Sequence, residues 1–392
     1  MNVFYDHQIF SEQNYGGISR YFVELIKRFS TNNENYCILP KIYSNNINIQ
    51  ELNLKNFVSY KAYESFLPKL NFKGKYRIFK LLSDLGLFIN PFSINQKSSL
   101  SAIKKLEIDI IHPTYYSTYF LILAKEKRIP YVVTIYDMIH ELFPDQFPDS
   151  DLIIANKKQS ILNASLILAI SQNTKNDIIK LYNISDKKIH VIPLASSLNF
   201  TRSKKELLMN TKQVEEYLLF IGNRSIYKNF AFFLESINSL LQSSNDLKLY
   251  CVGGGKPSND EIFLIKRFKL ESKVIFFQIN NNLELSKFYK NARLFIFPSI
   301  YEGFGIPILE AMNSGCLVAC SNTSSFPEVA GNAAFYFNPT NKESILNTIQ
   351  EALFNTKKRE LVFKNMLKQR QKFSWDITFK KTLQAYEEVL SY

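Results

Sequence analysis

The sequence predicts an α/β protein made of two Rossmann-like domains that face each other across a cleft. Two successive series of alternating strand and helix patterns support this prediction. The stretch between them, residues 196–216, is polar and charged. The chain has 392 residues, which is too long for a single core of ordinary size. We therefore expect a first domain over residues 1–195, a linker over 196–216 and a second domain over 217–375.

The first domain begins with a predicted strand at residues 3–10, followed by a loop that contains Gly16 and Gly17. Apolar residues at helical spacing then predict a helix from about Ile18 to Phe29. A glycine pair between a strand and a helix can offer backbone N–H groups to a phosphate, but such turns are common and the pair alone is a weak signal. Apolar runs predict further strands at residues 108–112, 131–136, 166–171 and 190–194. Their nearly continuous apolar character suits a parallel sheet that is covered on both faces.

The second domain repeats the alternation. Its predicted strands lie at residues 217–221, 247–252, 274–277, 294–297, 317–320 and 334–337. Its predicted helices lie at 230–241 and 283–292, with a turn at 325–329 and three helical segments at the end of the chain, the last over 376–390. Open parallel sheets bind ligands beyond the carboxyl ends of their strands, and the glycine loops of this half all follow predicted strands.

Residues 298–315 hold the most informative pattern of the chain. They follow the predicted strand 294–297, cross the loop Gly303-Phe304-Gly305 and enter a short helix with Pro307 near its start. Unpaired N–H groups and the helix dipole would point at one spot there and form a cradle for an anion. Two carboxylates bracket this cradle: Glu302 precedes the glycines, and we expect Glu310 in the first turn of the helix. Carboxylates accept hydrogen bonds from hydroxyls, so the ligand should carry both phosphates and hydroxyls, as a nucleotide sugar does.

Two cations lie in the loop after the strand that opens the second domain. Arg224 and Lys228 could neutralise a diphosphate there, and an arginine could bind it in a bidentate geometry. Surface charge is the ordinary explanation for such a pair. Binding of a diphosphate is favoured here because the same half of the chain carries the predicted anion cradle, with Glu302 and Glu310, at another strand end.

The overall charge is strongly basic, with a net charge of +13. Nucleic acid and an anionic membrane surface both fit such a charge, but no nucleic-acid motif or aromatic platform is present, so we expect no nucleic acid. The segment 66–80 interleaves apolar and aromatic residues with lysines and Arg77, as helices on anionic membranes do. A solvated basic face over a packed apolar face fits that segment equally well. The start shows no secretory pattern and no apolar run is long enough to span a bilayer, so we expect a cytoplasmic protein, with peripheral attachment to the inner face of the cell membrane as an option.

The combined motifs resemble those of the GT-B retaining glycosyltransferases of family 4. The pattern Glu302-(seven residues)-Glu310 with Gly-Phe-Gly inside it carries the resemblance, together with the loop from Gly222 to Asn229, the segments 16–22 and 171–174, and Trp375. The resemblance covers nearly the whole chain and is strongest to the bacterial enzymes that build O-antigens, capsules and other surface polysaccharides. It implies the GT-B fold, in which the C-terminal helix, here 376–392, crosses back to the first domain.

The resemblance also implies roles for individual residues. Arg224 and Lys228 would hold the donor diphosphate, and Glu302 would lie beside the donor sugar. Glu310 would hold the ribose hydroxyls. The remaining donor-binding positions would be glycines and their neighbours in the loops, namely Gly16, Gly17, Gly222, Asn229, Gly303, Phe304, Gly305 and Ile306. The implied reaction retains the anomeric configuration and needs neither a metal nor a cofactor, and no DxD-like acidic pair stands at a strand end with these motifs.

Two positions depart from the family pattern. Many members have a histidine in a Thr-x-His-Asp context, where this chain has Tyr136. Tyr136 itself, His140 or His112 could act at the sugar instead, and for each of them a structural role is at least as strongly expected. Gln278 stands where family members usually have a glycine near the nucleotide base, so the sequence does not identify the base of the donor.

The leading hypothesis is a transferase that moves a hexose from a nucleotide-diphosphate sugar, with GDP-mannose as our guess, to a lipid-linked or growing surface glycan. Another GT-B reaction, such as sugar-nucleotide epimerisation or phosphorolysis, is the enzymatic alternative. A catalytically silent subunit that only binds sugar nucleotides is the other alternative, because Tyr136 replaces the usual histidine.

Overall fold

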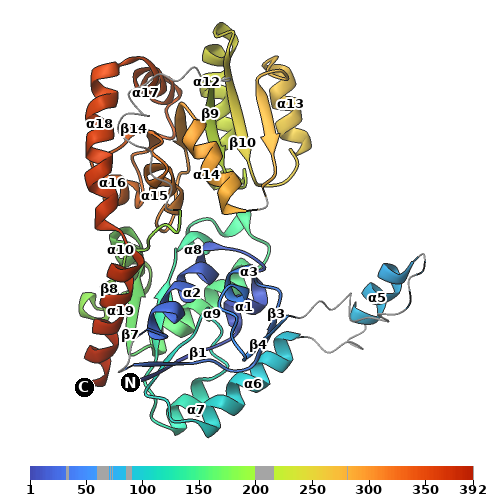
Figure 1. Cartoon of the computed structure of the whole chain (residues 1–392), viewed down its shortest axis with the longest axis vertical. Coiled ribbons are helices and arrows are strands. Elements are labelled where there is room, and N and C mark those ends of the chain that lie inside the picture. The colour runs from blue at the N-terminus through green and yellow to red at the C-terminus, as the bar shows by residue number, and fades with distance from the viewer. Residues whose placement is uncertain are drawn as a thin grey trace.

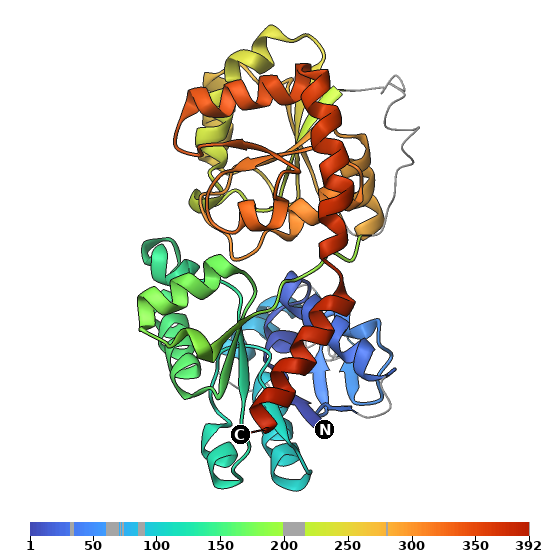
Figure 2. The ribbon, with the colours of Figure 1, turned by 90° about the vertical axis from the view of Figure 1, so that its left-hand side faces the viewer.

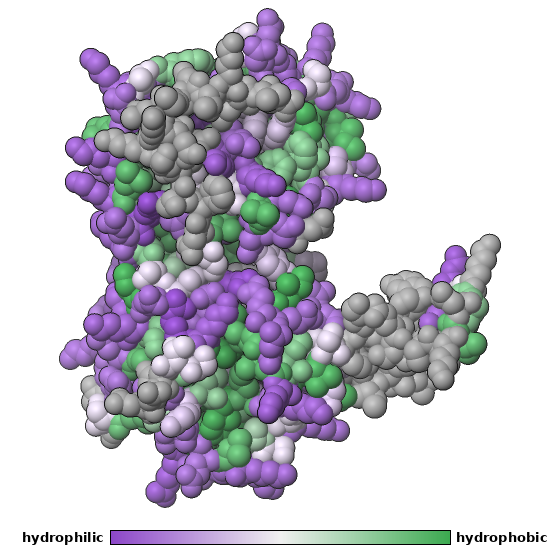
Figure 3. All heavy atoms as spheres, viewed as in Figure 1, coloured by the Kyte–Doolittle hydropathy of each residue, from purple (hydrophilic) through white to green (hydrophobic). Residues whose placement is uncertain are grey.

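The computed structural model describes residues 1–31, 35–59, 70, 72, 74–84, 91–198, 216–279 and 281–391. The chain forms two lobes stacked end to end, and both termini lie at the far end of the first lobe (Figure 1). A notch separates the two lobes on the molecular surface (Figure 3). The predicted linker 196–216 lies mostly outside the described residues, so its bounds stay a prediction.

The first lobe contains parallel strands in two three-stranded sheets, ordered β2-β1-β5 and β6-β7-β8, which one parallel bridge between Ile111 and Tyr131 connects. A separate parallel pair is formed by β3 and β4. The strands are β1 (Asn2–Tyr5), β2 (Tyr36–Ile38), β3 (Ile42–Ser44), β4 (Phe57–Ser59), β5 (Ile110–His112), β6 (Val132–Ile135), β7 (Leu166–Ala169) and β8 (Ile189–Val191). The helices are α1 (Gln8–Glu12), α2 (Gly17–Phe29), α3 (Ile47–Gln50), α5 (Lys75–Asp84), α6 (Pro91–Lys105), α7 (Leu121–Glu126), α8 (Ile139–Leu142), α9 (Ser150–Asn163) and α10 (Gln172–Tyr182).

The second lobe contains one six-stranded parallel sheet ordered β11-β10-β9-β12-β13-β14. This is the strand order of a doubly wound dinucleotide-binding sheet, with a switch point between β9 and β12. The strands are β9 (Glu216–Ile221), β10 (Leu247–Val252), β11 (Val274–Phe277), β12 (Leu294–Phe297), β13 (Val318–Ser321) and β14 (Phe335–Phe337). The helices are α12 (Phe230–Ser243), α13 (Asn259–Arg267), α14 (Asn282–Asn291), α15 (Ile306–Asn313), α16 (Phe326–Ala330), α17 (Lys342–Phe354) and α18 (Thr356–Gln369). The chain then ends in α19 (Trp375–Leu390), which lies on the first lobe.

Burial on both faces explains why the strands of the second sheet are almost wholly apolar. Along β9, Leu218 and Phe220 pack into the cluster that contains α12 and α17, whereas Leu219 joins the cluster on the opposite face. Helices lie on both sides of the sheet in Figures 1 and 2. The α/β class and the parallel sheets that the sequence predicts are therefore confirmed.

Two local predictions were wrong. The first strand ends at Tyr5 rather than at residue 10, because the Asp6 carboxylate accepts from the Gln8 N–H at 3.3 Å and turns the chain into α1. The Gly16-Gly17 loop therefore follows a short helix and not a strand. The predicted turn at 325–329 is the short helix α16, in which Pro327 lies at the start, where a missing N–H costs no helical bond.

The last helix returns to the first lobe, as the family resemblance implies. Figure 2 shows α18 and α19 running in succession from the second lobe along the first. The Tyr386 hydroxyl on α19 lies 2.5 Å from His112 Nδ1 and 3.0 Å from the Tyr5 hydroxyl, all in the buried core. At the crossing, Trp375 Nε1 donates to Ser197 Oγ at 3.0 Å. These buried polar contacts fix α19 in one register on the first lobe.

Among the described residues, none of the helices combines the length and the apolar composition that crossing a membrane requires.

Tyr386→Phe should destabilise the protein although it removes a single oxygen atom. It leaves the buried His112 Nδ1 without its partner, and an unpaired buried polar atom costs about 1–3 kcal/mol. Urea unfolding followed by circular dichroism measures the change. Glu387→Gln, on the exposed side of the same helix, is the control, and equal stability of both variants would contradict the anchoring role of Tyr386.

Candidate active site

The candidate site lies between β9 and β12, where the loops that follow these two strands meet. The β9 loop carries Lys228 and the β12 loop carries Glu302, and the Lys228 ammonium donates a hydrogen bond to Glu302 Oε1. Ser299 Oγ donates to the same oxygen at 2.9 Å. The structure thus brings together two residues that stand 74 positions apart in the chain.

Lys228 is held as a cation in this position. Burial alone would lower the pKa of Lys228, but the charge of Glu302, the neighbouring Tyr227, the hydrogen bond to Glu302 and the charge of Asp137 together raise this pKa above its ordinary value. The ammonium also lies 5.5 Å from the centre of the Phe297 ring, on the strand side of the pair. The lysine therefore offers a permanent positive charge at the switch point.

The glycine loop next to this ion pair keeps its N–H groups available. The Ser324 hydroxyl donates to the Glu302 carbonyl at 2.6 Å, and the Ser325 hydroxyl donates to the Phe304 carbonyl at 2.8 Å. These bonds give both carbonyls a hydrogen-bond partner. No described residue accepts from the N–H groups of Phe304, Gly305 or Ile306. The start of α15 thus has the unpaired N–H groups that the predicted anion cradle requires.

Both glycines of the loop are required by geometry. A Cβ on Gly303 would lie 1.7 Å from the carbonyl oxygen of Tyr136 in the first lobe, which no side chain can tolerate. Gly305 has φ +101°, in the left-handed region that favours glycine, and this conformation starts α15.

Glu310 lies in the second turn of α15, one turn later than predicted, because the helix begins at Ile306 rather than at the glycines. Its Oε2 accepts from the Tyr289 hydroxyl at 3.0 Å. Burial raises the pKa of Glu310 to about 7, and the bond from Tyr289 opposes this shift. Tyr289 is a site residue that sequence reasoning missed, since a tyrosine within an apolar helix face looks like an ordinary core residue.

Arg224 does not join this group. Its guanidinium donates to Glu261 Oε1 at 2.8 Å and to the carbonyls of the glycine loop after β10, from Gly253 to Lys256, at 3.0–3.3 Å. Only 3% of its side chain is exposed. In this structure Arg224 holds the loop of residues 253–255 in place, and its contact with a diphosphate stays a prediction.

The other predicted positions of the β9 loop shape the backbone. Gly222 has φ +107°, and Asn229 has φ +61° at the start of α12. The Asn229 side chain donates to the Pro339 carbonyl at 2.8 Å. Both residues therefore determine the path of the loop that carries Lys228.

The glycine loop of the first lobe faces the start of α15. A Cβ on Gly17 would lie 3.3 Å from Ile306 Cδ1, so the two loops are in van der Waals range. Asn48 donates to the Gly16 carbonyl at 3.1 Å and to Ser19 Oγ at 2.8 Å, and it is fully buried. The sequence reasoning missed Asn48, because nothing in its local pattern links α3 to a loop 30 residues earlier.

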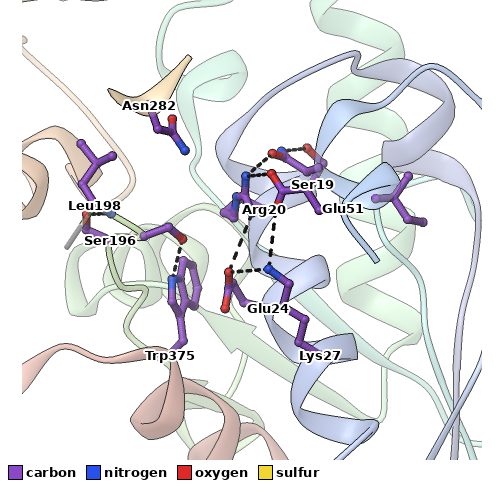
Figure 4. A network of polar contacts seen from close by, with 12 residues as sticks. Ser19, Arg20, Glu24, Lys27, Glu51, Ser196, Leu198, Asn282 and Trp375 are labelled. Atoms are coloured by element: carbon purple, nitrogen blue, oxygen red, sulfur yellow. Dashed lines mark hydrogen bonds and ion pairs between the residues drawn. The ribbon is translucent and has the colours of Figure 1, made fainter. Parts of the chain in front are cut away.

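Arg20 completes the support under this loop. Its guanidinium binds both carboxylate oxygens of Glu51, at 2.6 and 2.7 Å (Figure 4). It also donates to Asn48 Oδ1 at 2.7 Å. A bidentate arginine–carboxylate pair fixes both partners in orientation. The first lobe therefore presents the glycine loop on a rigid base.

Three residues were expected as substitutes for the family histidine that Tyr136 replaces, and they lie in different surroundings. His112 is buried between Tyr386 and Thr134, and burial lowers its pKa to about 3, so it is a neutral core residue away from the cleft. Tyr136 is buried too, and no described residue bonds its hydroxyl. His140 packs on Phe147 with ring centres 4.6 Å apart, and burial followed by the charge of Lys157 lowers its pKa. The structure does not bring His112 and the other two into one cluster.

Direct contacts connect the two lobes around the cleft. Tyr301 donates to Asp177 Oδ2 at 2.7 Å and accepts from the Met138 N–H at 3.2 Å. Thr174 donates to the Gly303 carbonyl at 3.2 Å. The Glu328 carboxylate accepts from two N–H groups at the start of α10, at 2.8 and 3.0 Å. These bonds hold the lobes close together at the glycine loop.

Family comparisons agree with this geometry. Residues 15–196 match the family model described as Glycosyltransferase Family 4, and residues 201–369 match the model described as Glycosyl transferases group 1. The chain is a GT-B glycosyltransferase.

Similar proteins match the enzyme over between half and nearly all of its length. This glycosyltransferase is 28% identical over 388 residues to O-antigen chain mannosyltransferase B of Escherichia coli, across 95% of this chain and 96% of the relative. It is 29% identical over 218 residues to O-antigen chain mannosyltransferase RfbU of Salmonella typhimurium, across 56% and 59% of the two chains. Its fold resembles that of Anabaena Alr3699/HepE, solved in complex with UDP and glucose, with a TM-score of 0.68 at 17% identity over 98% of this chain and 99% of that one. The glycosyltransferase WaaG has a TM-score of 0.64 at 15% identity, over 99% of both chains.

The raised pKa of Glu310 predicts a pH-dependent loss of stability in the glycosyltransferase without ligand. A carboxyl with a raised pKa stabilises the fold in its protonated form, below its ordinary value near 4.5, and this contribution disappears as the pH rises through about 7. Glu310→Gln should therefore melt above the wild type by a margin that grows from pH 5 to pH 8, as measured by scanning calorimetry. Glu343→Gln, on an exposed turn of α17, should show no such growth, and a constant margin for Glu310→Gln would contradict the shift.

Proposed function

We propose that this glycosyltransferase moves mannose from GDP-mannose to a growing or lipid-linked surface glycan, with retention of the anomeric configuration. The observation that carries the proposal is the Lys228–Glu302 pair beside the free N–H groups at the start of α15. A cation and a helix N-terminus offer two kinds of positive potential to one diphosphate. Glu302 and Glu310 offer carboxylates to the hydroxyls of the sugar and the ribose.

The reaction we infer breaks the bond between the anomeric carbon and the β-phosphate oxygen, and the bonding electrons stay with that oxygen. Lys228 and the N–H groups of Phe304 and Gly305 stabilise the new charge, which is the dominant electrostatic contribution. The acceptor oxygen then bonds to the anomeric carbon on the same face, and its proton moves to the departing phosphate oxygen. We propose that this charge stabilisation proceeds without a metal, so transfer should persist in excess EDTA.

The choice of mannose rests on similar proteins. Escherichia coli mannosyltransferase B and Salmonella RfbU are both named for mannosyl transfer to an O-antigen chain. A relative from Campylobacter jejuni is named as a transferase that acts on a diphospho-undecaprenol-linked sugar. These names support a glycan or lipid-linked acceptor and suggest that GDP-mannose should be tested first.

Lys228→Gln should lower kcat/KM for transfer by about 10²–10³-fold, the usual effect of removing one group that stabilises developing charge. Glu302→Gln should also reduce transfer, because the amide neither orients the lysine nor accepts as strongly from a sugar hydroxyl. Release of nucleotide from GDP-mannose in the presence of a mannoside acceptor measures both effects. Lys266→Gln, on the exposed side of α13, is the matched control.

Other outcomes would select the alternatives. Full activity of both Lys228→Gln and Glu302→Gln would refute this site assignment. Sugar release or epimerisation without an acceptor, or dependence on phosphate, would favour another GT-B reaction. Tight binding of sugar nucleotides with no turnover would favour a silent binding subunit.

We further propose that the segment 66–80 attaches the enzyme to an anionic membrane surface. Residues 66–69, 71 and 73 lie outside the described residues. The described part, α5, stands apart from both sheets in Figure 1, and Arg77, Ile78 and Leu81 on it are exposed. An apolar side chain next to a cation suits the boundary between headgroups and acyl chains.

Replacing the four cations Lys69, Lys73, Lys75 and Arg77 by glutamine should weaken binding to phosphatidylglycerol vesicles by at least about tenfold, since each basic residue near such a surface contributes about 1 kcal/mol. Vesicle sedimentation measures the loss. The control replaces four exposed lysines elsewhere in the same lobe, namely Lys104, Lys105, Lys158 and Lys187. Undiminished binding of the 69–77 variant would remove the proposal.

A further inference from the structure

Asp137 lies at the end of β6, directly opposite the glycine loop of the second lobe. A Cβ on Gly303 would lie 3.1 Å from Asp137 Cβ, so this aspartate borders the cradle from the first lobe. Its Oδ1 accepts from the Ile139 N–H at 3.1 Å, and no described residue donates a hydrogen bond to its Oδ2. About a third of the side chain is exposed, at 32%. One carboxylate oxygen is therefore fixed and the other remains open to a ligand.

A fully buried lysine lies beneath this aspartate. Lys157 on α9 has a side-chain exposure of 0%, and its ammonium donates to the Asp137 carbonyl at 3.0 Å. It also donates to Glu141 Oε2 at 2.8 Å and lies 3.8 Å from Asp137 Oδ1. The Tyr116 ring lies 5.3 Å from the ammonium on another side. A charge removed from water this completely is costly, and it persists only where its partners hold it.

The charges of this cluster leave one negative charge facing the cleft. Lys157 is balanced by Glu141, which is 6% exposed and also accepts from Tyr182 at 2.9 Å. The cluster has two carboxylates and one lysine, so the charge of Asp137 is not balanced within it. This charge acts across the cleft on Lys228, where it adds to that of Glu302. A carboxylate placed opposite a diphosphate cradle cannot bind the phosphates, which repel it, but it can accept from a hydroxyl.

We propose that Asp137 is a further substrate-contacting residue, which accepts a hydrogen bond from a sugar hydroxyl in the cleft, and that Lys157 is the positioning residue that holds it in place. The inference rests on the proposed function, because it requires a sugar between the two lobes. The hydroxyl belongs either to the acceptor or to the transferred sugar, and the two sources give different kinetics. In both cases the proton that leaves the acceptor still goes to the departing phosphate oxygen.

Asp137→Asn tests the contact, because it keeps the shape and removes the charge. A hydrogen bond to a charged group lost in this way corresponds to a fall in transfer of about tenfold to a hundredfold. The assay uses GDP-mannose with octyl α-mannoside, and binding of GDP alone should not weaken, since a carboxylate that borders the diphosphate cradle makes no attractive contact with the phosphates. Asp151→Asn, an exposed aspartate on α9, is the matched control.

Two further measurements identify the source of the hydroxyl. If it belongs to the acceptor, Asp137→Asn lowers kcat/KM for octyl α-mannoside, while slow hydrolysis of GDP-mannose without acceptor is unchanged. If it belongs to the donor sugar, hydrolysis falls too, and the Asp137→Asn variant no longer binds GDP-mannose more tightly than GDP. Either pattern supports the proposal.

Lys157 requires a paired design because Lys157→Met alone leaves Glu141 as an unpaired buried charge. The variant Lys157→Met/Glu141→Gln removes both charges and should still unfold cooperatively. If Lys157 acts through Asp137, transfer falls in this variant, and adding Asp137→Asn costs less than twofold more. A lysine that serves only the packing of α9 would instead give independent effects that multiply.

Three results would overturn the inference. These are wild-type transfer by Asp137→Asn, an equal loss of GDP binding and transfer in that variant, or multiplicative effects in the Lys157 series. A wild-type enzyme that transfers no sugar would instead overturn the proposed function itself, and this inference with it.

Discussion

The backbone of the loop after β12 touches the backbone of the loop after β6, and this contact sets the width of the cleft. Gly303 has no side chain, and a single added carbon would collide with the Tyr136 carbonyl at 1.7 Å. The bonds of Thr174 to Gly303 and of Tyr301 to Asp177 keep the contact closed. The donor cradle and the first lobe can share one substrate because this approach is so close.

Three largely buried ion pairs surround the site, and each of them stabilises a different loop. Arg224 with Glu261 ties down the loop after β10, whereas Lys157 with Glu141 supports the loop after β6. Only the pair of Lys228 and Glu302 faces the free N–H groups of α15. Charges kept from water need close partners, so the two outer pairs stiffen the frame, while the central pair can exchange its partner for a ligand.

Motifs along the chain located the strand ends of the second lobe to within one residue, together with the glycine loop before α15, because these depend on short-range rules of periodicity and glycine geometry. They could not decide where long side chains point. Arg224 and Lys228 stand four residues apart in one loop, yet one turns toward the glycine loop after β10 and the other toward Glu302. His112 looked like a candidate at a strand end, but Tyr386, 274 residues later, takes it into the core.

The sequence by itself determined the two α/β lobes, the glycine cradle at the start of α15 and the resemblance to family 4, since each follows from residues that are neighbours in the chain. Only the tertiary structure decided which cation meets Glu302 and which residues support the loops from below. It also placed Asp137 against Gly303. These are contacts between distant segments, and their energies depend on burial and on three-dimensional distance, which no local pattern records.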